Sequence, residues 1–213
     1  MDMYPGQTFE VEAMGFTFRA RIEADCGMGE PWKEHDGHGV VSDWTTRDKR
    51  PGEIVLASER RSRRYYNVQE TMKLARRDGW GLGDDDKASL LERLRRTRVA
   101  QPGAGGRYIL QELPGPWKPL TRGEITVEAV RRDFEQLRRW CDDQWHWVGL
   151  VVELLDADGD AVDGVSDSLW GMESDADDCL RETAREMAGG LAQGLVREAA
   201  ECLYWNQRDV ETV

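Results

Sequence analysis

Apolar and polar residues alternate along the first part of the chain, which is the pattern of half-buried β-strands. The alternation predicts a hairpin of two strands over 7–13 and 16–23. Two further strands are expected over 53–59 and 63–66, followed by helices over 68–77 and 84–98. Asn67 is the expected N-cap of the first of these helices.

The last third of the chain has a clearer periodicity. Apolar residues spaced by three and four over 127–141 predict a helix that Thr126 caps. Strands are expected over 145–156 and 161–172, on either side of a turn rich in Asp and Gly. A long helix capped by Ser174 follows, with an apolar face of Leu, Ala and Met and three glycines that weaken it.

These elements predict an α+β fold, with antiparallel sheets, helices packed on one face and a C-terminal α-β-β-α unit. A chain of 213 residues can form one large domain or two small ones. The Gly-rich segment 102–106 is the clearest linker. It divides a β-rich α+β region over 1–101 from an acidic α-β-β-α region over 107–213, with one continuous domain as the alternative.

The net charge of −12 is unevenly distributed along the chain. Residues 1–107 contain 19 Lys and Arg against 18 Asp and Glu, whereas residues 108–213 contain 10 against 23. Between Asp142 and Asp178 there are twelve acidic residues and no Lys or Arg. Such an asymmetry indicates the chemistry of a partner, although it says nothing about the fold.

The acidic segment predicts a surface that binds a basic partner. Alternate residues of a strand project from one face about 6.6 Å apart, so carboxylates there can imitate a row of phosphates. Charge would steer the partner, and the indole of Trp170 would prolong the contact. A solvated face that serves solubility alone is the alternative. The candidate partner-binding residues are Asp142, Asp143, Glu153, Asp156, Asp158, Asp160, Asp163, Asp167, Trp170, Glu173 and Asp175.

A second hypothesis places nucleic-acid binding in the Arg-rich segment 47–77. Arg60, Arg61, Arg63 and Arg64 stand next to two tyrosines, a combination that can bind phosphates and stack on bases. The net charge of the whole molecule opposes this function, because it repels a polyanion at distances that salt does not screen. Direct nucleic-acid binding is therefore not the expected activity.

The weak candidates for a metal site are His35 and His38, which have carboxylates and Cys26 nearby. Their spacing matches no strong zinc pattern, so a metal-dependent enzyme stays an alternative. The Asp-rich turn over 156–160 differs from a calcium loop and reads as a hairpin turn. No GxSxG or GxxxxGK[ST] motif is present, and the sequence predicts a protein that is not an enzyme and has no cofactor.

The longest obvious apolar run, 147–152, is far shorter than the roughly 20 residues that cross a bilayer. The N-terminus has neither the basic nor the apolar region of a signal peptide. Cys26, Cys141, Cys179 and Cys202 form no CxxC pair and no dense framework. These features predict a cytoplasmic protein with free, mostly buried thiols and no membrane partner.

Four segments have distinctive amino-acid sequences: GEPWKEHDGHG over 29–39, RDKRPGE over 47–53, ARRDGWG over 75–81 and SLWGMES over 168–174. Together they resemble a group of uncharacterised proteins of tailed phages and prophages. That group has no assigned activity, so the resemblance implies only a phage gene expressed in a bacterial host. Small acidic phage proteins often act as anti-CRISPR or anti-restriction inhibitors, which is an analogy of strategy.

The expected function is therefore the inhibition of a host defence or nucleic-acid-handling complex. The protein would bind a basic protein or nucleoprotein surface through an acidic face that imitates nucleic acid. Self-association is a further alternative, in which the basic N-terminal half of one copy contacts the acidic C-terminal half of another.

Overall fold

The computed structural model describes residues 3–34, 37–102, 108–114 and 118–210, and the side chains of all but 97–102, 108–114 and 203–210 among these. The fold is α+β, as predicted. Contacts divide the chain into a first unit, residues 1–29 and 143–213, and a second unit, residues 30–142. The predicted boundary at 102–106 falls mostly outside the described residues and stays a prediction.

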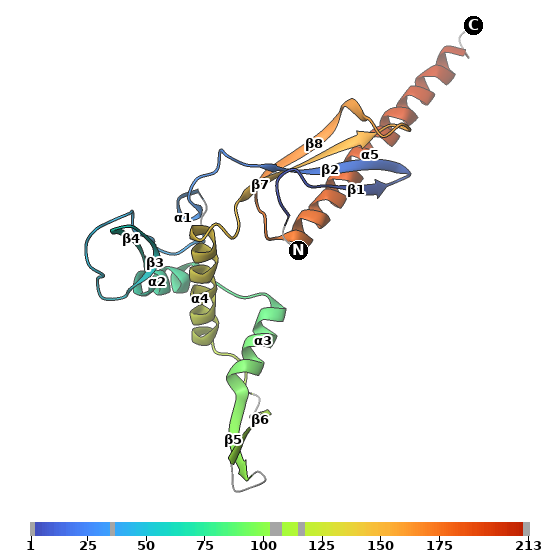
Figure 1. Cartoon of the computed structure of the whole chain (residues 1–213). Coiled ribbons are helices and arrows are strands. Elements are labelled where there is room, and N and C mark those ends of the chain that lie inside the picture. The colour runs from blue at the N-terminus through green and yellow to red at the C-terminus, as the bar shows by residue number, and fades with distance from the viewer. Residues whose placement is uncertain (1–2, 35–36, 103–107, 115–117, 211–213) are drawn as a thin grey trace. The chain divides into compact units, whose positions relative to one another are not determined.

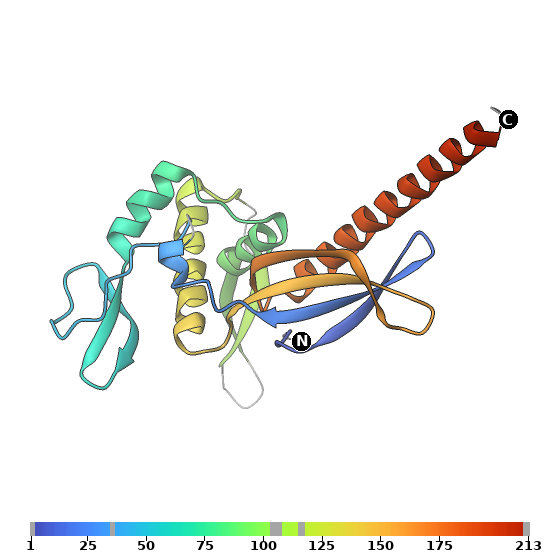
Figure 2. The ribbon, with the colours of Figure 1, turned by 90° about the horizontal axis from the view of Figure 1, so that it is seen from above.

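The first unit is a four-stranded antiparallel sheet covered on one face by a long helix (Figures 1 and 2). The strand order is β1-β2-β7-β8, so β8 is an edge strand. Both predicted hairpins are confirmed, β1 with β2 and β7 with β8. The elements are β1 (Thr8–Ala13), β2 (Phe16–Ala24), β7 (Trp147–Leu155), β8 (Ala161–Glu173) and α5 (Asp177–Val210).

The core of the first unit lies between the sheet and α5. Every second residue of the two central strands is fully or nearly buried, because strand side chains alternate between faces. The matching stripe of α5 is Leu180, Ala184, Ala188 and Ala192, each with no exposed surface. Small alanine side chains let the helix backbone lie close to the sheet. The buried strand residues are Phe18, Ala20, Ile22, Val148, Leu150, Val152 and Leu154.

The inward face predicted for helix α5 is confirmed only in part. Leu180 and Ala184 are fully buried as predicted, and the side chain of Leu203, also predicted to face inward, lies outside the described part. Met187, Leu191 and Leu195 were predicted to face inward too, but these side chains are only half-buried. The reason is that the alanine stripe, rotated from them around the helix, takes the close contact with the sheet. The helix continues unbroken through its glycines and runs beyond the sheet, where residues 196–202 are exposed (Figures 1 and 2).

The second unit consists of helices and two hairpins. Its core contains Leu56, Tyr66, Ala75, Val130 and Leu137. The elements are α1 (Pro31–Glu34), β3 (Glu53–Glu59), β4 (Ser62–Asn67), α2 (Val68–Asp78), α3 (Asp84–Arg95), β5 (Arg96–Pro102), β6 (Tyr108–Pro114) and α4 (Arg122–Cys141). The predicted α-β-β-α order at the C-terminal end is confirmed as α4, β7, β8 and α5.

Two helix starts were predicted at the wrong residue. Helix α4 begins after Thr121, which forms a reciprocal capping box with Glu124, while Thr126 is buried inside the helix. The hydroxyl oxygen of Ser174 accepts a hydrogen bond from the backbone N–H of His146 instead of capping α5. In contrast, Asn67 caps α2 as predicted, by accepting from the N–H of Glu70.

Two smaller predictions are also revised, one on the end of a helix and one on the cysteines. Helix α3 ends at Arg95 and not near 98, because the chain continues directly as strand β5. All four cysteines are free, but Cys26, Cys179 and Cys202 are exposed and only Cys141 is partly buried. Among the described residues, no helix combines the length and apolar character needed to cross a membrane.

Candidate functional site

The charge asymmetry follows the two structural units more closely than the two halves of the sequence. The first unit carries 22 acidic and six basic residues, a net charge of −16. The second unit carries 19 acidic and 23 basic residues, a net charge of +4. The acidic character is therefore a property of one folded unit, the sheet with α5, and is stronger there than the sequence halves indicated.

The β7–β8 turn gathers several of the predicted partner-binding residues. One carboxylate oxygen of Asp156 accepts hydrogen bonds from the backbone N–H groups of Asp158 and Asp160, both at 2.9 Å. Asp156 thus holds the turn in shape, as Asp does in Asx-turns. Asp158 and Asp160 in the turn and Asp163 near the start of β8 are exposed. Within the described structure none of these four residues, which we call the turn aspartates, forms an ion pair with Lys or Arg.

The remaining candidates do not join the turn in a single acidic ridge. Glu153 pairs across the sheet with Ser166, whereas Asp167 pairs with the core residue Val152. Cross-strand partners share a face, so Glu153 and Asp167 project from opposite faces of the sheet. Asp142 caps the end of α4 in the second unit. Asp143, Glu173 and Asp175 belong to the first unit but lie outside the turn.

The sheet face opposite α5 carries charges of both signs. Arg19 and Glu153 are cross-strand partners, and a guanidinium nitrogen of Arg21 lies 3.5 Å from a carboxylate oxygen of Glu153. Arg19 also donates a hydrogen bond of 2.5 Å to the carbonyl oxygen of Gly159 in the turn. The chain's own arginines thus offset the acids of this face, whereas the exposed turn aspartates have no Lys or Arg partner among the described residues.

Trp170 lies on the same open face of the sheet. Its ring packs over Gly149, where any β-carbon would collide with the indole. The side chain is 46% exposed although it is large and apolar. From Gly149 to Asp156, β7 spans about 23 Å, so Trp170 and the turn could meet the same partner only at separate points. Trp170 is therefore an exposed aromatic side chain at the far end of this face.

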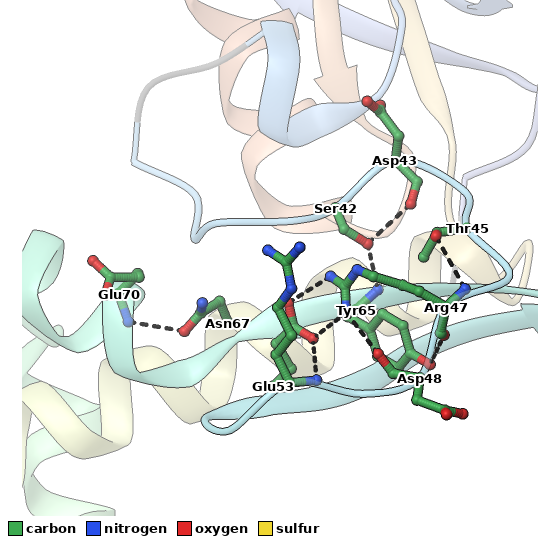
Figure 3. A network of polar contacts seen from close by, with 10 residues as sticks. Ser42, Asp43, Thr45, Arg47, Asp48, Glu53, Tyr65, Asn67 and Glu70 are labelled. Atoms are coloured by element: carbon green, nitrogen blue, oxygen red, sulfur yellow. Dashed lines mark hydrogen bonds and ion pairs between the residues drawn. The ribbon is translucent and has the colours of Figure 1, made fainter.

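The Arg-rich segment is largely committed to bonds within the second unit (Figure 3). Both terminal nitrogens of Arg47 donate to Glu53 at 2.7 Å, and the N–H of Arg50 donates to the same carboxylate. Arg64 is buried, bonds to Glu30 at 2.5 Å and stacks on the rings of two tryptophans. The bond from Arg50 comes from its backbone N–H, so it is the guanidiniums of Arg47 and Arg64 that stabilise the unit and are not free to bind phosphates.

The tyrosines next to the arginines cannot stack on bases. Tyr65 and Tyr66 have 1% and 0% of their surface exposed. The hydroxyl of Tyr65 donates to the carbonyl oxygen of Arg47, as Figure 3 shows. Arg60, Arg61 and Arg63 remain exposed in and beside the β3–β4 turn. The expectation that these tyrosines stack on bases is thus wrong. The exposed cations that remain include those of this turn and Lys49, Arg50 and Arg76 elsewhere in the segment.

His38 belongs to a hydrogen-bond cluster that sequence reasoning missed. Its Nδ1 lies 2.7 Å from one carboxylate oxygen of Asp133, and the other oxygen accepts from Gly39 N–H and from the hydroxyl of Tyr66. Burial raises the pKa of Tyr66, and the nearby Asp133 carboxylate raises it further. The cluster joins the 37–52 loop to β4 and α4. The spacing of 95 residues between His38 and Asp133 gave no sequence signal for it.

The metal hypothesis receives no support from these contacts. His35 lies outside the described residues, and His38 is bonded to Asp133. Within the part of the chain that the structure describes, no group of three or more His, Cys, Asp or Glu is arranged to hold a metal ion. The turn at 156–160 joins two strands, unlike a calcium loop between helices.

Two carboxylates of the second unit make its stability sensitive to acid. Hydrogen bonds from Arg47 lower the pKa of Glu53 to about 2, and bonds from Arg131 lower that of Glu128 to about 2. A glutamate whose pKa is lower in the folded than in the unfolded protein stabilises the fold above its unfolded-state pKa of about 4.3. This stabilisation is lost as the pH falls towards the folded-state value of about 2. We expect the free energy of unfolding to fall steadily over that interval, as measured by urea titrations. A variant with both Glu53→Gln and Glu128→Gln should have a lower free energy of unfolding at neutral pH, and should lose less of it as the pH falls.

No protein-family model, no curated protein sequence and no solved structure matches this chain. Its functional site must accordingly be argued from its own residues, and the charge of the first unit is the strongest feature they offer.

Proposed function

We propose that this protein is an inhibitor that binds a basic surface of a host defence or nucleic-acid-handling complex through its acidic first unit. The observation that carries the proposal is the net charge of −16 on that unit, with exposed, unpaired aspartates at the β7–β8 turn. The partner is a protein or nucleoprotein, and the phage origin implied by the sequence resemblance gives the setting.

Electrostatic steering is the physical basis of the proposal. A strongly charged unit attracts an oppositely charged surface over a Debye length of about 8 Å at physiological salt and raises the association rate. Docked carboxylates then accept charge-assisted hydrogen bonds from Arg and Lys. Because the acids are placed at a turn and on two faces of a sheet, the likeness to nucleic acid is one of charge density and not of regular spacing.

Affinity capture tests the proposal. The tagged chain is incubated with bacterial lysate at low and high salt, beside a turn variant and a control variant. In the turn variant, Asp156, Asp158, Asp160 and Asp163 are replaced by Asn. In the control variant, four exposed acids of the second unit are replaced by their amides: Glu34, Asp48, Glu59 and Asp85. The two variants change the net charge equally.

We expect a basic nucleic-acid-binding protein to be retained by the wild-type chain and the control variant at low salt, and to be lost from the turn variant. If neither salt condition retains such a protein, the proposal is wrong. Gel shifts with duplex and single-stranded DNA and RNA complete the test, because the inhibitor should bind none of them. A shift that Arg60→Ala, Arg61→Ala and Arg63→Ala abolish would favour the regulator instead.

Trp170 should affect how long the complex lasts rather than how fast it forms. Aromatic anchors commonly account for 2 kcal/mol or more of interface energy, mainly through the dissociation rate. With the captured partner, Trp170→Ala should raise the dissociation rate by about tenfold or more and leave the association rate within about twofold. Surface plasmon resonance measures both. An unchanged dissociation rate would remove Trp170 from the interface.

A further inference from the structure

A groove runs between the edge strand β8 and helix α5 in the first unit. It has a volume of about 420 Å³. Its apolar wall consists of Val165 on β8 and of Met187, Leu191 and Leu195 on α5, all half-buried. The remaining lining residues are three glycines and three acids: Gly164, Gly190, Gly194, Asp167, Glu186 and Glu198.

The α5 residues of the groove repeat at the spacing of a packed helix face. Positions 187, 190, 191, 194, 195 and 198 follow the 3–1–3–1–3 pattern with which soluble helices face a core. The alanine stripe takes the closest contact with the sheet. Met187, Leu191 and Leu195 pack only against the margin of the same core, and their remaining surface lines the groove. Val196, one residue further along the helix, is also 44% exposed.

The two groove glycines of α5 have no role in the packing of the unit. Glycine inside a helix costs about 1 kcal/mol relative to alanine. A β-carbon added at Gly190 or Gly194 would meet nothing within 4 Å, so no neighbouring atom requires a glycine there. Their effect is to leave the groove open, with room for another backbone to come close to α5.

The charges lining the groove select its occupant. All three charged lining residues are acids, and no Lys or Arg with a described side chain lines the groove. A second copy of α5 is disfavoured: an antiparallel pair centred between Gly190 and Gly194 sets Glu186 against Glu198, and a parallel pair sets each acid against its counterpart. A helix whose apolar face is flanked by Lys or Arg satisfies both the apolar wall and the acidic rim.

We propose that the β8–α5 groove binds a cationic amphipathic helix of the partner protein. The choice of a cationic partner rests on the proposed function, and the groove itself rests on the geometry above. From Glu186 to Glu198 the groove side of α5 extends about 18 Å, enough for three turns of a docked helix. The apolar contacts would supply affinity that persists when salt weakens the charges.

Designed peptides test this inference. The probe is a fluorescent helix-forming peptide with Leu at 3–4 spacing flanked by Lys, and fluorescence anisotropy measures its binding to the full chain. Two further peptides replace Leu by Ser or Lys by Glu. Gly190→Leu fills the groove while relieving the helix glycine penalty, and Gly189→Leu is its control, because Gly189 is the adjacent glycine and does not line the groove. Glu186→Lys, Glu198→Lys reverses the rim at exposed positions.

We expect the Leu/Lys peptide alone to bind, with a loss of about tenfold or more for Gly190→Leu and for the rim variant, and a change below about twofold for Gly189→Leu. If Gly190→Leu binds the Leu/Lys peptide as tightly as the wild type does, or if the Ser/Lys peptide binds as tightly as the Leu/Lys peptide, the groove is not the binding site and the proposal is wrong. Peptide binding that only the turn variant loses would reject the groove and leave the proposed function standing. Salt-dependent dimers in light scattering that Gly190→Leu abolishes would replace the partner helix by a second copy.

Discussion

Replacing the four turn aspartates by Asn should weaken binding to the basic partner by roughly 30- to 1000-fold. Each exposed charge pair contributes on the order of 0.5–1 kcal/mol, and four of them together about 2–4 kcal/mol. Asn supplies an amide oxygen in place of the carboxylate oxygen with which Asp156 holds the turn, so the hairpin should stay folded. Isothermal titration calorimetry with the captured partner measures the loss, and circular dichroism checks the fold.

The control variant distinguishes the effect of the turn aspartates on binding from the effect of the net charge of the molecule. It removes the same four charges from the second unit and should change the dissociation constant by less than about threefold. Equal losses in both variants would mean that the partner responds only to the total charge of the molecule. The turn would then have no special part in binding.

Asp133→Ala should destabilise the second unit by about 3–5 kcal/mol. The substitution leaves the N–H of Gly39, the hydroxyl of Tyr66 and the imidazole of His38 without their carboxylate partner. Buried donors that lose a partner cost about 1–3 kcal/mol each, and Tyr66 has no surface exposed to water that could replace the bond. Hydrogen exchange followed by mass spectrometry should show faster exchange across the 37–52 loop, β4 and α4.

Glu135→Ala is the matched control for this prediction. Glu135 lies two residues further along α4, is exposed and bonds only to Arg131 among its described contacts. Its loss should change stability by less than about 0.5 kcal/mol. If Asp133→Ala unfolds at the same denaturant concentration as the wild type, the cluster does not hold the loop. Binding by the first unit should survive in either case.

Local patterns made much of the fold predictable. The alternation around Met14 and Gly15, the Asp/Gly turn between β7 and β8, and the cap at Asn67 are signals within a few residues, and all appear in the structure. Predictions that depended on distant contacts were less successful. The buried stripe of α5 is set by how closely the sheet lies, which the helix sequence alone does not contain.

The candidate site shows the same difference between local signals and distant contacts. Composition alone showed that the acids are concentrated towards the C-terminal end, but it did not show how they are grouped in space. Glu153 and Asp167 separate onto two faces because the register of β7 and β8 shifts between Glu153 and Leu155, next to the turn. Similarly, Arg21 offsets Glu153 only because β2, far away in the sequence, is the neighbour of β7. Pairing of distant strands is not visible in a single sequence.

The salt dependence of the association rate is the most direct test of electrostatic docking. Stopped-flow or surface plasmon resonance would follow the wild-type chain, the turn variant and the control variant with the captured partner over a range of salt concentrations. The account predicts a steep fall in the wild-type rate with rising salt, a similar fall for the control variant and a much flatter dependence for the turn variant. The same slope for all three proteins would contradict it.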